Sequence, residues 1–204
     1  MGGLIAIARG LGAVNAALLA LGRWIGIVAM GLMVIAILIQ VFWRYVLSDP
    51  LPWPEEAARF LMLWLTGLVA PTALRRGGFV AIDMIQLVLP RLIGGLLVLL
   101  LSCLALAVLV TAARIGWAEV TGFSGRFATS SLYYPVLATG EAATSWFTWE
   151  KMPRSWMMAS LLVGVVLLAM VSVELILRQI AVLAGRADQL PEIPMASDMA
   201  AGAE

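Results

Sequence analysis

The chain has 204 residues, of which 63% are hydrophobic and 12% are charged, whereas an ordinary soluble domain is about 45–50% apolar and about 25% charged. Such a small number of polar side chains cannot cover a compact particle in water, and lipid must therefore surround much of the exterior. The protein is predicted to be an integral membrane protein. Thirteen basic against twelve acidic residues give a formal charge of +1, which argues against nucleic acid as a partner.

The N-terminal segment, residues 3–22, is hydrophobic but interrupted by Arg9 and Asn15. At 100° per residue, Arg9, Asn15 and Arg23 fall within one third of a helical wheel. This pattern predicts an amphipathic helix lying on the membrane surface. The alternative is a secretory signal, but a basic residue splits the apolar region and no small-residue cleavage site follows it.

A spanning helix needs about 20 mostly apolar residues. Residues 24–43 contain no charged residue and predict the first span. Residues 54–74 predict the second span, because Pro54 and the two glutamates after it are typical of a first helical turn. This span should end at Arg75 and Arg76, which suit a helix carboxyl end and precede two glycines that release the backbone.

The second half of the chain predicts two more spans. Residues 79–89, which include Asp83, are amphipathic and predict a short interfacial helix before a third span at residues 92–113. Residues 114–154 form the only long non-spanning connection, and their aromatic side chains favour a position along the headgroup region. Residues 155–177 predict the fourth span.

The expected architecture is therefore an all-α membrane protein with four transmembrane helices. Residues 1–185 form a single membrane domain, and residues 186–204 are rich in Pro, Ala and acids and predict a disordered tail. Basic residues divide almost equally between the two sides, so overall charge bias does not orient the spans. The short turn with Arg75 and Arg76 favours the cytoplasmic side, which places both termini in the cytoplasm.

A cluster of charges surrounds the turn between the first two predicted spans, which we call the first hairpin. Ionisable groups at or inside the bilayer usually need partners. Glu55 and Arg59 are four residues apart in the favourable order, and Glu56 is expected to face Arg44 across the hairpin. Asp49 lies between these helices. The cluster predicts either a proton or ion relay or a structural clamp, and we favour the clamp because polar groups near span ends can reach headgroups or water. Asp83 also has two interpretations: it could be an ion ligand, or it could lie on the polar face of an interfacial helix. We favour the second.

Other residues give weaker signals. Gly22 and Gly26 form a G-x-x-x-G spacing that permits a close helix partner, and Glu174 and Arg178 lie four residues apart near the end of the fourth span. The sequence has no His and a single Cys, Cys103, so the usual zinc ligand, general base and haem ligands are missing. No catalytic, cofactor-binding or metal site is predicted.

Several consecutive motifs resemble one family, the small integral-membrane (Q) subunit of tripartite ATP-independent periplasmic (TRAP) transporters. They are Phe42-Trp43-Arg44-Tyr45-Val46, the stretch from Pro50 through Trp53, Pro54, Glu55, Glu56 and Arg59 to Phe60, then Trp64, Arg75-Arg76-Gly77 and Val80-Ala81-Ile82-Asp83. The similarity covers about forty residues and several spacings, which is more specific than hydropathy.

The resemblance implies a four-span scaffold subunit of the bacterial inner membrane, with no enzymatic activity. Its implied partners are a larger transmembrane transport subunit, encoded as a separate chain since a polar tail follows the fourth span, and a periplasmic binding protein that delivers an organic acid. Uptake would be driven by an ion gradient, usually sodium, and phospholipid surrounds the helices. Structural or interface roles are carried by resemblance onto Arg44, Trp53, Glu56, Arg59, Trp64 and Asp83, to which the charge pattern adds Glu55, Arg75 and Arg76.

The sequence departs from the family pattern at two places. Residues 129–154 look expanded, with Tyr133, Tyr134 and Trp149 among the added aromatics, and a histidine often found shortly before the aspartate is Phe79 here. Two functions from other classes stay open: a self-sufficient homo-oligomeric carrier or channel, and the membrane anchor of a redox complex, which the absence of His disfavours.

Overall fold

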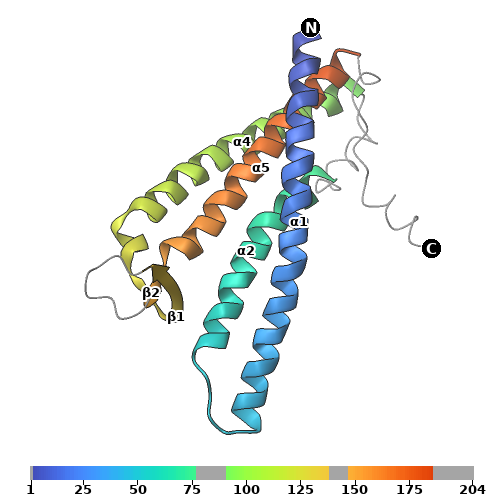
Figure 1. Ribbon diagram of the computed structural model, residues 1–204. Coiled ribbons are helices and arrows are strands. Elements are labelled where there is room, and N and C mark those ends of the chain that lie inside the picture. The colour runs from blue at the N-terminus through green and yellow to red at the C-terminus, as the bar shows by residue number, and fades with distance from the viewer. Residues whose placement is uncertain (1, 77–90, 138–146, 186–204) are drawn as a thin grey trace, which may run out of the picture.

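A computed structural model describes residues 2–76, 91–137 and 147–185 of the chain (Figure 1). It contains four long helices, α1 (Gly2–Tyr45), α2 (Trp53–Arg75), α4 (Arg91–Thr121) and α5 (Ser155–Leu183). Between α4 and α5 lie the short 3-10 helix η1 (Phe123–Arg126) and the strands β1 (Ala128–Leu137) and β2 (Phe147–Pro153). All four long helices are long and apolar enough to cross a membrane, which confirms the predicted number of spans.

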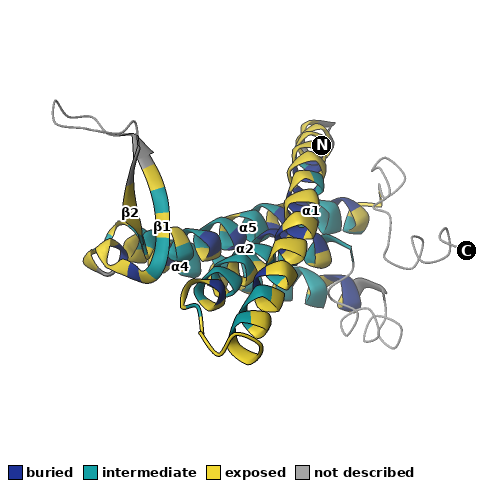
Figure 2. Ribbon diagram, turned by 60° about the horizontal axis from the view of Figure 1, so that its bottom comes forward, coloured by how far each residue is buried: buried dark blue, intermediate teal, exposed yellow. Residues whose placement is uncertain are grey.

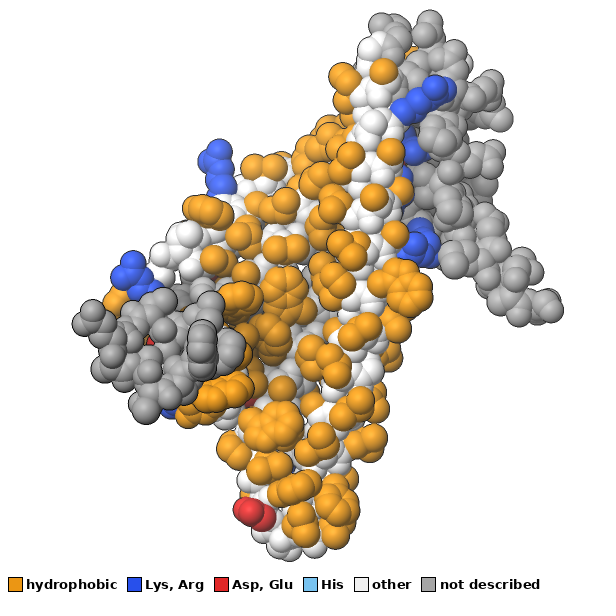
Figure 3. Space-filling model, in the orientation of Figure 1, with side chains coloured by type: hydrophobic (Ala, Val, Ile, Leu, Met, Phe, Trp, Pro, Cys, Tyr) orange, Lys and Arg blue, Asp and Glu red, His pale blue; other side chains and the backbone are white. Residues whose placement is uncertain are grey.

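The helices pack as two antiparallel pairs, α1 with α2 and α4 with α5, and α2 also packs against α5. Figure 1 shows that the two pairs converge where the first half of α1 crosses α5. They diverge toward the opposite end, where α1 connects to α2 and where the strands β1 and β2 lie. In Figure 2 most of α1 is exposed, and buried positions lie along the helix contacts. Hydrophobic side chains cover most of the face drawn in Figure 3, as expected for a surface in contact with lipid or other apolar helices.

Helix α1 is continuous from Gly2 to Tyr45. Its 44 residues correspond to about 66 Å, roughly twice the thickness of a hydrocarbon core of about 30 Å. The segment expected on the membrane surface is thus the first half of the same helix as the first span. Its polar face was predicted to include Asn15, and this is wrong, because Asn15 is only 2% exposed and packs against α5. A surface position for the segment stays a prediction.

Helix α2 begins and ends close to the predicted residues. It starts at Trp53, with proline at its first positions and Glu55 and Glu56 in its first turn. It ends at Arg75, and the backbone N–H of Arg76 donates to the carbonyl of Thr72 at 3.1 Å. The expected interfacial helix at residues 79–89, Asp83 within it and the tail at residues 186–204 lie outside the described residues.

The connection between the last two helices contains a β-hairpin that the sequence analysis did not predict. Helix α4 extends to Thr121, past the expected end of the span at residue 113. Strands β1 and β2 then pair antiparallel, with Tyr133 opposite Lys151 and Pro135 opposite Trp149. Aromatic and β-branched side chains favour such strands, so the aromatic residues of this segment form a folded element beyond the helix ends.

The G-x-x-x-G spacing of α1 has its partner within the chain. A Cβ on Gly22 would lie 3.1 Å from the carbonyl oxygen of Leu68, and one on Gly26 would lie 2.8 Å from Cγ2 of Val69. Leu68 and Val69 of α2 therefore occupy the space that a side chain at Gly22 or Gly26 would fill. The two glycines position α1 against α2.

Candidate functional site

The most highly connected polar group of the described structure is the carboxylate of Glu174 on α5, which is fully buried. Arg75, the last residue of α2, binds it with two nitrogens: Nη2 lies 2.8 Å from Oε1 and Nε lies 3.0 Å from Oε2. Arg178, one turn further along α5, donates from Nε to Oε1 at 3.0 Å. This bidentate contact of Arg75 is the geometry that makes arginine–carboxylate pairs strong and directional.

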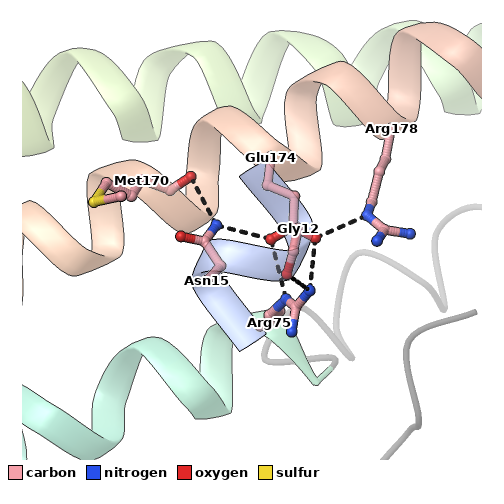
Figure 4. Close-up of polar contacts among 6 residues, drawn as sticks. All are labelled: Gly12, Asn15, Arg75, Met170, Glu174 and Arg178. Carbon is pink, nitrogen blue, oxygen red and sulfur yellow. Dashed lines mark hydrogen bonds and ion pairs between the residues drawn. The ribbon is translucent and has the colours of Figure 1, made fainter. Parts of the chain in front are cut away.

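Helix α1 completes this site with two residues (Figure 4). The side-chain amide of Asn15 donates to Oε2 of Glu174 at 2.8 Å and to the carbonyl oxygen of Met170 at 3.3 Å. The backbone carbonyl of Gly12 accepts from Nη2 of Arg75 at 2.9 Å. Three helices therefore meet at one carboxylate. We call this set the Glu174 network: Gly12, Asn15, Arg75, Met170, Glu174 and Arg178.

Glycine at position 12 is needed for this approach. A Cβ there would lie 2.9 Å from Oε1 of Glu174 and 3.3 Å from Nη2 of Arg178. Any larger residue would push the carboxylate or the guanidinium away from α1. The backbone carbonyl of Gly12 can therefore contact Arg75 only because the residue has no side chain.

The network has the composition of a structural clamp. Each carboxylate oxygen of Glu174 accepts two hydrogen bonds, which uses the approximately four acceptor positions of an ionised carboxylate. A saturated, buried carboxylate has no free position for a ligand. Breaking such a pair is costly because the remaining charge is left buried without a partner. The arrangement therefore holds α1, α2 and α5 together.

The predicted clamp at the first hairpin takes a different form. Arg59 and Glu55 form the expected ion pair, but both belong to α2 and their side chains are 72% and 55% exposed. This pair therefore links no two helices, and exposed pairs of this kind contribute little to stability. The helix-linking charges lie at the opposite end of α2, at Arg75.

Glu56 does not face Arg44, and that prediction is wrong. Its carboxylate accepts from the backbone N–H of Ser130 at 3.1 Å, and from the backbone N–H of Ser131 at 2.6 Å and its hydroxyl. The hydroxyl of Ser131 also donates to the carbonyl of Pro52 at 3.2 Å. Glu56 therefore binds the start of β1 to the start of α2, because this end of β1 offers it two backbone N–H groups and a hydroxyl.

The other predicted positions are separate from these two sites. Arg44 lies exposed in the last turn of α1, and Trp53 is 40% exposed. Trp64 is half-buried, with its ring 6.3 Å from that of Phe60. Just beyond the end of α2, burial lowers the pKa of Arg76, and the nearby positive charges of Arg23 and Arg75 lower it further. Within the described residues, no group of three or more acidic, Cys or His residues could hold a metal ion.

Most of the Glu174 network was not predicted from the sequence. The i, i+4 spacing of Glu174 and Arg178 is confirmed as an ion pair, but Arg75 was assigned only to the helix end and Asn15 to a surface face. The available signal was general: a carboxylate and an amide within apolar helices are costly unless they meet partners. That rule would have marked Asn15 and Glu174 as residues that need a partner, without showing that they need each other.

The fold and these contacts define a multi-pass membrane protein with four apolar helices, three of which are joined by a buried ion network. Residues 33–182 match the model of a family described as Tripartite ATP-independent periplasmic transporters, DctQ component. This range is well over half of the chain, so the chain belongs to this family, and the resemblance seen in the sequence is confirmed. No curated protein and no solved structure matches the chain.

Proposed function

We propose that this chain is the scaffold and anchor subunit of a transporter that imports an organic acid, is driven by an ion gradient and receives its substrate from a binding protein. Family membership is the observation that carries this proposal. The Glu174 network supports it, because a carboxylate with every acceptor position occupied fixes helices rather than binding a passing ion. The chain then provides a rigid surface for a larger transport subunit.

The proposed setting is the bacterial inner membrane, with both termini in the cytoplasm. In this orientation Arg75 and the Glu174 network lie toward the cytoplasmic side, and the β-hairpin lies toward the periplasm. The two proposed protein partners are a large transmembrane subunit, encoded as a separate chain, and a periplasmic substrate-binding protein. A coupling ion such as sodium would bind to the large subunit.

Reconstitution tests this proposal directly. Liposomes would contain this chain alone, the large subunit alone, or both, and each would be assayed for uptake with the binding protein and a labelled organic acid that it binds. We expect uptake only when both membrane subunits are present with an inward ion gradient. Uptake by this chain alone would instead identify a self-sufficient carrier, and a haem or quinone spectrum in the pure chain would identify a redox anchor.

We also propose that the β-hairpin contributes to docking of the binding protein. Glu56 supports this, since its bonds to Ser130 and Ser131 tie the base of the hairpin to α2. A hairpin held in this way costs less entropy to engage than a free loop of similar length. Deletion of residues 129–150 should weaken the apparent affinity of the assembled complex for the binding protein, and an unchanged affinity would contradict this role.

A further inference from the structure

An apolar groove of about 670 Å³ lies between α4 and α5. Its walls include Leu106, Val110 and Trp117 of α4, and Ala169 and Val173 of α5. The two helices approach closely near the hairpin, where a Cβ on Gly116 would lie 3.4 Å from Leu162, and again at the other end, where one on Gly95 would lie 2.6 Å from Leu183. The Gly116–Leu162 contact lies at the hairpin-side end of the groove, and the Gly95–Leu183 contact lies beyond its other end.

One charged residue, Arg114, lines this groove. It is exposed, and within the described parts of the chain it has no ion pair and no hydrogen-bond acceptor for its guanidinium. An unpaired arginine on an apolar helix is costly in a membrane, so such residues usually meet an anion or reach the interface. Within the described residues, the charge of Arg114 is therefore left for a negative group that can approach the open side of the groove.

The position of Arg114 indicates where that group comes from. Trp117, one turn nearer to the hairpin, is 63% exposed, and exposed tryptophans on membrane helices mark the headgroup level. Arg114 is therefore about 4.5 Å from that level along the helix axis. From Arg114 to Leu106 the groove extends about 12 Å further into the membrane, close to the hydrocarbon depth of one leaflet, about 15 Å.

We propose that this groove is a binding site for one phospholipid of the hairpin-side leaflet. Its phosphate would accept hydrogen bonds from the guanidinium of Arg114, and an acyl chain would lie along Val110, Leu106, Ala169 and Val173. The combination of one cation at headgroup depth and an apolar channel of one-leaflet length matches the two parts of this ligand.

A transmembrane helix of another protein fits the groove less well. Such a helix would have to bring a carboxylate to the depth of Arg114 to meet its charge, whereas a phospholipid carries its phosphate at headgroup depth. The lining of the groove beyond Arg114 is apolar, which suits an acyl chain.

Native mass spectrometry of the purified full chain tests the site. The probes are phosphatidylglycerol with two oleoyl chains and the diacylglycerol with the same chains, which lacks the phosphate. We expect retained phosphatidylglycerol but little diacylglycerol. Arg114→Gln should lower phosphatidylglycerol retention about fivefold, and Ala169→Phe, which fills the channel, should lower it as well. Arg126→Gln, at an exposed arginine of η1 outside the groove, is the matched control and should leave retention unchanged.

Three outcomes would overturn the proposal. Equal loss in Arg114→Gln and Arg126→Gln would mean that the lipid is held by general charge, and equal retention of both probes would mean that the phosphate is not recognised. If Arg114→Gln keeps its lipid but no longer co-purifies with the large subunit, the groove is a protein contact. Failure of the transport assay described above would leave these retention results intact, so the two proposals can be distinguished.

Discussion

Gly67 on α2 and Gly164 on α5 bring the backbones of the two central helices into contact. A Cβ on Gly164 would lie 2.7 Å from the Cα of Gly67 and 3.0 Å from its carbonyl oxygen. Pro71, four residues after Gly67, is buried inside α2 and has no N–H to donate to that carbonyl. The carbonyl of Gly67 therefore has no N–H donor four residues later in its own helix, and it lies at a close helix crossing, where weak Cα–H···O contacts recur.

This crossing predicts a clear effect of one added methyl group. Gly164→Ala should lower the free energy of unfolding by about 1–3 kcal/mol, because the helices must separate to admit the Cβ. The control is Gly31→Ala in α1, where a Cβ would meet no atom within 4 Å and the change should be neutral or stabilising. Unfolding of both variants by SDS titration in mixed micelles measures the difference. Equal stability would show that the contact is loose.

The Glu174 network predicts a large loss when its carboxylate is neutralised. Glu174→Gln removes the carboxylate charge that the guanidinium groups of Arg75 and Arg178 share, and these side chains are only 14% and 12% exposed. Breaking a buried pair in this way costs about 3–5 kcal/mol. Glu55→Gln removes the exposed carboxylate of the Arg59 pair and should cost at most about 0.5 kcal/mol. Thermal unfolding in detergent compares the two, and losses of similar size would contradict the assignment of the clamp to Glu174.

Gly12 predicts a test of the same network that changes no charge. Gly12→Ala gains the helix preference of alanine, worth about 1 kcal/mol, but places a Cβ 2.9 Å from Oε1 of Glu174. Gly10→Ala gains the same preference, and its Cβ meets no atom within 4 Å. We therefore expect Gly10→Ala to be more stable than Gly12→Ala in the same unfolding assay. The reverse order would mean that α1 does not approach Glu174 closely.

Glu56 predicts a local effect at the hairpin. Glu56→Gln replaces a carboxylate that accepts from two backbone amides, and hydrogen bonds to charged groups contribute about 1.5–3 kcal/mol. Amide hydrogen exchange at Ser130 and Ser131 should accelerate at least tenfold, while the helices keep their protection. Glu55→Gln, one residue earlier, should leave both amides unchanged. Unaltered exchange in Glu56→Gln would show that the hairpin is held by other contacts.

The helices could be predicted from the sequence because membrane spans depend mainly on the length of apolar segments. Residues 155–177 and 92–113 carry that signal alone, and Pro54 and Arg75 add local preferences that fix where α2 begins and ends. The continuity of α1 could not be predicted in the same way. Arg9 and Asn15 reduce the apolar character of its first half, and only contact with α5 shows that Asn15 faces inward.

The partners of the polar residues were harder to predict than the helices. Glu174 and Arg178 lie on one helix, so their spacing alone brings them together. The bond between Asn15 and Glu174 joins residues 159 positions apart, and it depends on the angle at which α1 crosses α5. The contact of Glu56 with Ser131 depends on a hairpin whose strands carry a weak sequence pattern. Arg44, which is much closer to Glu56 in the sequence than Ser131 and carries the opposite charge, was the more obvious partner.

The convergence of the two helix pairs at the Glu174 network, with the hairpin end spread apart (Figure 1), gives the molecule unequal widths at its two ends. In a bilayer such a wedge displaces more lipid area from one monolayer than from the other. Its conformational energy is then coupled to the lateral pressure profile and to curvature. Lipids of different spontaneous curvature should therefore change how far the pairs separate, even with every side chain unaltered.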